Sequence, residues 1–132
     1  MKNGLRQQKS GDLSDRIEQL ALLPLFENPA SKWRYGSSAD VLARVVEVAS
    51  GVPFDIYLDE NIFEPLGMRD TRFLHAVPNR DDLAVGYTQA ENGDLVQAPL
   101  QIDSDWNEGG SGLVSTASDY MRFALMLSLI HI

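Results

Sequence analysis

The sequence predicts a mostly helical α+β structure that contains one hairpin and a few short strands. Four segments carry helical signals, either apolar residues at the helical period or residues that begin and end helices well. Residues 91–94 place Asn-Gly between two short runs of strand-forming residues, which is a strong hairpin signal. With 132 residues, 44% of them hydrophobic, the chain has the length and composition of one globular domain.

Two helices are predicted in the first part of the chain. Asp12 is suited to cap a helix that Pro24 ends. Ser37 or Ser38 caps the next helix, and Gly51 is a good C-terminal stop for it. The apolar positions of this second helix recur at the helical period and are Val41, Leu42, Val45, Val46, Val48 and Ala49. We expect this apolar stripe to lie in the core.

Shorter elements follow. Pro53 begins a third helix that runs to about Ile62, residues 65–68 form a sharp turn, and residues 71–74 alternate as a short strand does. The Asn-Gly hairpin comes next, and residues 98–108 have the composition of a loop.

A glycine-rich turn over residues 109–112 precedes the last helix. Thr116 caps this helix, and Asp119, three residues later, is its expected partner in a capping box. Gly110 and Ser111 are candidates to line a substrate cleft. A glycine-rich turn before a capped helix also has a purely structural explanation, so both interpretations stand at this point.

The composition excludes several classes of site. The chain has 11 Lys and Arg against 19 Asp and Glu, a net charge of −8, and it has no basic stripe, so we expect no nucleic-acid partner. It has no cysteine, and its two histidines, His75 and His131, lie far apart, so we expect no metal and no cofactor. No apolar run is long enough to span a membrane. Neither the compartment nor the oligomeric state follows from these features.

Tyr35 is the residue with the clearest chemical potential. It lies between an extended segment and the start of the second helix, with Ser37 two residues later. A phenol held rigidly in this way acts as a general base only when neighbouring cations favour its phenolate form. Alternatively, Tyr35 is a half-buried aromatic residue that pins the loop to the helix, and the neighbouring Trp33 serves packing.

Three blocks of the sequence resemble a known family. They are the segment from Trp33 to Gly51, the run Phe-Glu-Pro-Leu-Gly-Met within residues 62–71, and the glycine-rich block of residues 109–119. In this order they resemble the serine β-lactamase-related hydrolases, which include class C β-lactamases, esterase relatives and some D-amino-acid peptidases. The resemblance covers most of residues 24–126.

The resemblance implies a fold and an activity. The fold is a mostly helical part of the β-lactamase/transpeptidase-like fold, with most of the central antiparallel sheet missing. The activity is acyl transfer through an acyl-serine intermediate on esters, amides or β-lactams. Tyr35 matches the tyrosine of the family's Tyr-x-Asn motif and would be catalytic. Ser37 stands where many members have asparagine, would orient its neighbours, and favours an esterase over a β-lactamase.

Essential parts of such a site are missing from the sequence. None of the three lysines, Lys2, Lys9 and Lys32, follows a serine at the spacing of the family's Ser-x-x-Lys nucleophile motif, and no Lys-Thr-Gly or His-x-Gly triplet follows the glycine block. We therefore expect residues 1–126 to be a partial domain that is inactive by itself and poorly stable. Residues 127–132 match the translation of a transposase end used in sequencing libraries, so we expect an adaptor-derived tail there.

Two alternatives remain open at this stage. The first is a free-standing, non-catalytic helical interaction module, which would lack a nucleophile without any truncation. The second is a family member that has become a non-catalytic binder.

Overall fold

The computed structural model describes residues 12–98 and 106–129, so most of the predicted loop over 98–108 lies outside the described residues. The described chain is about half helical, with strands of two or three residues, which confirms the predicted α+β class. Its elements are α1 (Leu13–Ala21), α2 (Ser38–Ser50), α3 (Phe54–Leu58), the π-helical turn η2 (Asp59–Phe63), α4 (Glu64–Leu66), β1 (Arg72–Phe73), the 3-10 turns η3 (Leu74–Ala76) and η4 (Arg80–Asp82), β2 (Tyr87–Gln89), β3 (Leu95–Gln97), β4 (Leu113–Val114) and α5 (Ala117–Leu129).

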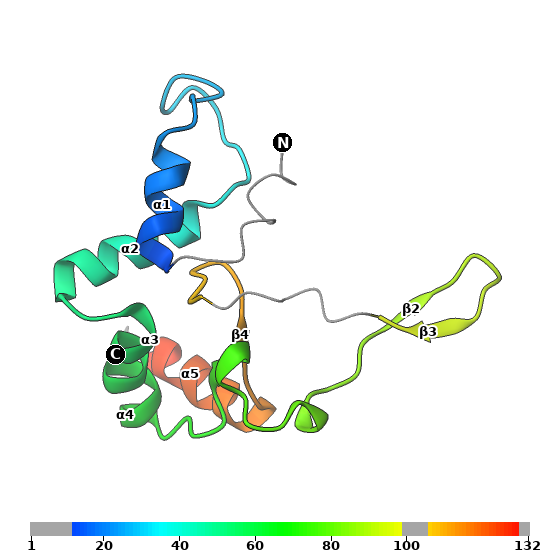
Figure 1. The fold of residues 1–132 in the computed structure, drawn as a ribbon. Helices are drawn as coiled ribbons and strands as arrows, with labels where there is room; N and C mark the ends of the chain where they lie inside the picture. Colours follow the sequence, from blue (N-terminus) through cyan, green and yellow to red (C-terminus); the bar gives the residue numbers. More distant parts are fainter. Residues whose placement is uncertain (1–11, 99–105, 130–132) are drawn as a thin grey trace.

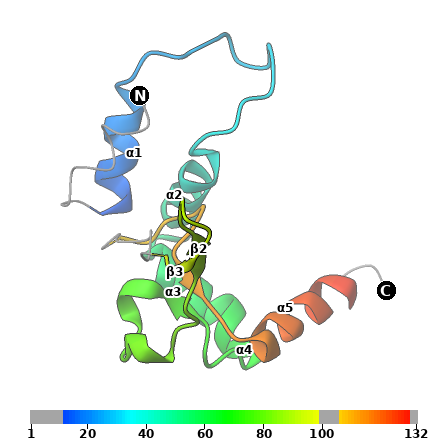
Figure 2. The ribbon, with the colours of Figure 1, turned by 90° about the vertical axis from the view of Figure 1, so that its right-hand side faces the viewer.

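The helices form a chain of neighbours. α1 packs on α2, α2 on α3, and α4 contacts α5. The β2–β3 hairpin projects away from the helices (Figure 1). In the view turned by 90°, α5 extends away from α1 and α2 (Figure 2). Within the described residues, no helix is long and apolar enough to cross a membrane.

The first two helices begin where the sequence predicts, and α2 ends at its predicted stop, whereas α1 already ends at Ala21, before the predicted end at Pro24. The Asp12 carboxylate accepts a hydrogen bond from the Asp15 N–H at 3.0 Å, which satisfies one of the free donors at the start of α1. Ser37 occupies the N-cap position of α2, but its hydroxyl makes no capping hydrogen bond. Gly51 ends α2 with a φ of +78°, a conformation that glycine adopts without a steric penalty.

The third helix is longer than the sequence predicts. α3 continues through the π-helical turn η2 into α4, where the helical run ends at Gly67 with a φ of +67°. Only residues 67 and 68 of the predicted turn over residues 65–68 therefore lie outside the helical run. Pro65 follows directly after the π-helical turn η2, inside the helical run that ends at Gly67.

The strands form two separate antiparallel pairs. β2 pairs with β3 in the register Thr88 to Val96, and Gly93 has a φ of +90° in the connecting turn, so the predicted hairpin is confirmed. β1 pairs with β4, with Arg72 opposite Val114. The strand predicted over residues 71–74 is shortened to two residues. β4 was not predicted, because two residues after a glycine-rich turn show no alternation.

The core is small. The buried apolar side chains among the described residues are Leu13, Ala43, Phe63, Met68, Phe73 and Leu74. The prediction that the apolar stripe of α2 lies in the core is wrong: Leu42 and Val48 are 63% and 69% exposed, and Val45 is also exposed. The helical period identifies the apolar face of α2, but in the described chain no element covers most of it.

This open face has a measurable consequence. We expect the purified chain to bind a dye that reports apolar surface and to self-associate, without a cooperative monomeric thermal transition, because contiguous exposed apolar surface favours association. Replacing Leu42, Val45 and Val48 together by polar residues should reduce dye binding. Calorimetry and analytical ultracentrifugation provide the check, and a sharp two-state melt of a monomer would contradict the expectation.

Candidate functional site

Tyr35 lies in the segment that connects α1 to α2. Its side chain is 75% exposed, and its ring centroid lies 6.4 Å from that of Trp33 with the planes tilted by 57°. The interpretation of Tyr35 as a half-buried pin is therefore wrong for this structure. So is the packing role expected for Trp33, which is 83% exposed. The two rings form an exposed aromatic pair directly before α2.

Charged groups close the loop that carries this pair. The Glu27 carboxylate forms an ion pair with Lys32 at 2.9 Å and another with Arg34, whose guanidinium lies 5.2 Å from the centroid of the Phe26 ring. Lys32 is the only lysine in the part of the chain that the structure describes. Because it is paired with Glu27, its charge is partly neutralised. No local pattern in the sequence indicates this role of Glu27, since the pairing depends on the path of the loop.

The glycine-rich loop meets the first turn of α2. The Gly110 N–H donates a hydrogen bond to the Asp40 carboxylate at 3.0 Å. Gly109 approaches α2 so closely that a Cβ on it would lie 2.2 Å from the Ala39 carbonyl oxygen and 2.7 Å from the Cβ of Ala43. Only glycine permits this approach. The structure thus brings the loop of Gly110 to the helix end that carries Ser37.

Ser111 and Gly112 fix the remainder of this loop. The Ser111 hydroxyl donates a hydrogen bond to the carboxylate of Glu108 within the same loop. Gly112 has a φ of +91°, and its carbonyl accepts a hydrogen bond from the Leu74 N–H at 2.7 Å. The loop is therefore attached to α2 at one end and to the end of β1 at the other.

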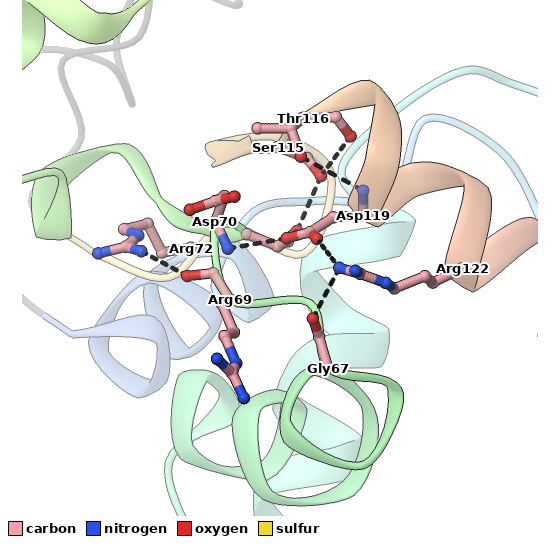
Figure 3. A network of polar contacts seen from close by, with 9 residues as sticks. Gly67, Arg69, Asp70, Arg72, Ser115, Thr116, Asp119 and Arg122 are labelled. Carbon is pink, nitrogen blue, oxygen red and sulfur yellow. Dashed lines mark hydrogen bonds and ion pairs between the residues drawn. The ribbon is translucent and has the colours of Figure 1, made fainter.

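A buried carboxylate organises the region behind the loop (Figure 3). Asp119 is 1% exposed, and its carboxylate accepts hydrogen bonds from the Asp70 N–H at 2.8 Å and the Thr71 hydroxyl at 3.0 Å. It also pairs with Arg122 at 2.7 Å. The predicted capping box is half right. Thr116 accepts from the Asp119 N–H at 3.3 Å, but the Asp119 side chain binds the segment before β1 instead of returning to the cap.

Further contacts complete this network. Arg122 donates a second hydrogen bond, to the Gly67 carbonyl at 2.8 Å. The hydroxyls of Thr71 and Ser115 lie 2.8 Å apart and share a hydrogen bond. The start of α5, one end of the β1–β4 pair and the turn after α4 are thus joined through one buried group.

Two concavities lie elsewhere on the chain. One, of about 660 Å³, is lined mainly by residues 55–76, and the other, of about 550 Å³, lies between α1, α2 and residues 106–107. His75 contributes to both; it stacks on Phe73 and shares a hydrogen bond with Asn107 at 2.8 Å. None of the four predicted site residues lines either of these concavities. Within the described ranges, no group of three or more His, Asp or Glu residues could hold a metal ion.

Comparison with known proteins gives a consistent picture. The Beta-lactamase family model matches residues 2–130. Esterase EstB of Burkholderia gladioli is 31% identical over 129 residues, which cover 84% of this chain and 33% of the esterase. Lovastatin esterase of Penicillium rubens is 30% identical over 115 residues, which cover 80% of this chain and 28% of that enzyme. The chain therefore spans about a third of the length of the curated relatives it matches.

Solved structures share the fold. EstCE1, described as a hydrolase with promiscuous acyltransferase activity, superposes with a TM-score of 0.74 at 24% identity, covering 89% of this chain and 36% of that one. A penicillin-binding protein from Bacillus halodurans superposes with a TM-score of 0.69 at 26% identity, with the same two coverages. The predicted partial β-lactamase-like fold is confirmed. The predicted roles of Tyr35, Ser37, Gly110 and Ser111, and the adaptor origin of residues 127–132, stay predictions.

The buried carboxylate can be tested directly. Replacing Asp119 by alanine leaves the Asp70 N–H and the Thr71 hydroxyl without their acceptor, which should lower the local opening free energy by about 2 kcal/mol and speed amide exchange at Asp70 roughly 30-fold. Hydrogen exchange followed by mass spectrometry measures this. Asp81→Ala, at an exposed acidic residue of η4, is the matched control. Equal exchange in both variants would show that Asp119 does not hold β1.

Proposed function

Because the chain belongs to the Beta-lactamase family, we propose that the intact protein of which it forms part is a serine hydrolase of the esterase type. Two esterases are among the relatives at 30% identity or above. Ser37, in place of the asparagine that many family members carry, agrees with an esterase. The family match also argues against a free-standing interaction module without catalytic ancestry.

One observation supports a location for the proposed active site. Gly110 and Asp40 are 70 residues apart in the sequence, yet a hydrogen bond of 3.0 Å joins them. It brings the glycine block to the first turn of α2, directly after Tyr35 and Ser37. Two of the three sequence blocks that resemble the family therefore meet at one end of one helix, where an active site needs its groups to converge.

The proposed chemistry is acyl transfer. A serine hydroxyl from a Ser-x-x-Lys motif outside this chain attacks the ester carbonyl, and the acyl group passes to that serine while the alcohol leaves with a proton. Water then hydrolyses the acyl-serine. Tyr35 accepts or donates the proton in these steps, and Ser37 orients neighbouring groups with its hydroxyl. Gly110 and Ser111 line the substrate-binding site. The substrate is an ester in preference to an amide or a lactam.

The 132 residues alone lack the nucleophile for this reaction. We expect the purified chain to hydrolyse p-nitrophenyl esters no faster than its Tyr35→Phe variant does, because the phenol has no acyl-serine chemistry to assist. A Tyr35-dependent turnover would contradict this. The coding sequence upstream of residue 1 provides a second test. A Ser-x-x-Lys motif there supports an active serine hydrolase, and the absence of this motif supports a non-catalytic family member.

The role of Tyr35 can be measured in a chimera. The segment of esterase EstB that aligns with this chain is replaced by the chain, so that the remaining two thirds come from the esterase. Tyr35→Phe should lower kcat for a p-nitrophenyl ester by roughly a hundredfold to ten-thousandfold and leave KM nearly unchanged, as expected for a lost proton-transfer group. Tyr120→Phe, at an exposed tyrosine of α5, is the control. Equal kcat values for the two variants would exclude Tyr35 as a catalytic residue.

A further inference from the structure

We propose that Asp40 is a positioning residue that fixes the glycine-rich loop of residues 109–111 against α2, beside Tyr35 and Ser37. The role of Asp40 in catalysis rests on the proposed function, whereas the attachment of the loop to α2 is a property of this chain. Neither the family resemblance nor the helical pattern assigns a role to Asp40. In the sequence it is only an acidic residue in the first turn of a helix.

The hydrogen bonds of Asp40 show what its side chain does. It is the third residue of α2, the position from which an acidic side chain commonly returns to the N-cap in a capping box. Here its carboxylate accepts the Gly110 N–H at 3.0 Å instead. Its own N–H donates to the Ser37 carbonyl at 3.1 Å. Asp40 therefore connects the N-cap backbone of α2 and the distant loop through one residue.

A steric contact works together with this hydrogen bond. Gly109 lies against Ala39 and Ala43, one turn apart on α2, at a distance that excludes any side chain on Gly109. The hydrogen bond to Asp40 and this contact act on consecutive loop residues from the same face of the helix. Together they define both the height of the loop along α2 and its distance from the helix.

The far end of the loop is held independently. The Gly112 carbonyl accepts the Leu74 N–H at 2.7 Å, and β4 then pairs with β1. Between Gly109, which packs against α2, and Gly112 lie only Gly110 and Ser111, the residues proposed to contact substrate, and Gly110 is itself held through its N–H. A loop fixed on both sides of two residues presents them in one geometry, which is the requirement for orienting a substrate beside a general base. Without Asp40, the attachment on the α2 side loses its only polar contact seen in the described residues.

The test compares three variants of the full chain by hydrogen exchange. Asp40→Ala removes the acceptor and should speed exchange of the Gly110 amide at least about tenfold, because a hydrogen bond to a charged group is lost. Asp40→Asn keeps a side-chain oxygen acceptor and should restore most of the protection. Asp55→Ala removes an acidic residue from the first turn of α3 and controls for the lost charge at a helix start. The exchange rate of the Asp70 amide, immediately before β1, should be unchanged in all three variants.

Gly109→Ala gives a second, independent perturbation. Its Cβ would clash with backbone of α2, so the loop must move and the Gly110 amide should again lose protection. Gly36→Ala, where a Cβ meets nothing within 4 Å, is the matched control. Unchanged exchange at Gly110 in both Asp40→Ala and Gly109→Ala would overturn the inference. An increase spread equally over Gly110 and Asp70 would also overturn it, because Asp40 would then support the whole fold and not the loop.

The effect of Asp40 on catalysis is measured in the EstB chimera. There, Asp40→Ala should lower kcat about tenfold, and Asp40→Asn should recover most of this loss, because rescue by an uncharged acceptor identifies the hydrogen bond as the cause. If Tyr35→Phe has no effect in the chimera, the proposed function fails while the exchange result stands. If Tyr35→Phe abolishes activity but Asp40→Ala leaves kcat unchanged, the proposed function stands and Asp40 has no positioning role.

Discussion

The Asp119 carboxylate connects three parts of the chain: the start of α5, the segment before β1 and, through Arg122, the turn after α4. The β1–β4 pair is only two residues long on each strand, too short to be stable by itself. Asp119 binds the Asp70 N–H and the Thr71 hydroxyl immediately before β1, and Thr71 in turn shares a hydrogen bond with Ser115 immediately after β4. Because the glycine-rich loop leads directly into β4, its position follows from this buried group.

The other side of the loop depends on the absence of a side chain. Gly109 approaches α2 closely, and Gly110 reaches the Asp40 carboxylate. The exposed Tyr35, Ser37 and the glycine-rich loop therefore lie at the N-terminal end of α2, while the apolar face of the same helix is exposed. In an intact hydrolase, further parts of the protein would complete this arrangement. The proposed nucleophile would act near the N-terminal end of α2, where Tyr35 is exposed.

Local rules of the sequence predicted the parts of the fold that local interactions determine. The cap at Asp12, the stop at Gly51 and the hairpin around Gly93 each depend on hydrogen bonds or dihedral angles within a few residues. Contacts over long separations were not accessible in this way. The Asp119 side chain looked like the partner of the Thr116 cap, yet it binds a segment 48 residues away, and Asp40 gave no sign of its contact with Gly110. Periodicity likewise predicted the apolar face of α2 but not its exposure.

Tyr35 is proposed to belong to a serine-hydrolase site whose nucleophile lies outside these 132 residues. A fluorophosphonate probe, which bonds to an activated serine hydroxyl with loss of fluoride, tests this on the intact protein when the labelled peptide is identified by mass spectrometry. We expect one labelled serine, in a Ser-x-x-Lys motif outside the present sequence, with labelling that Tyr35→Phe strongly slows. A label on Ser37, Ser111 or another serine of this chain would contradict it.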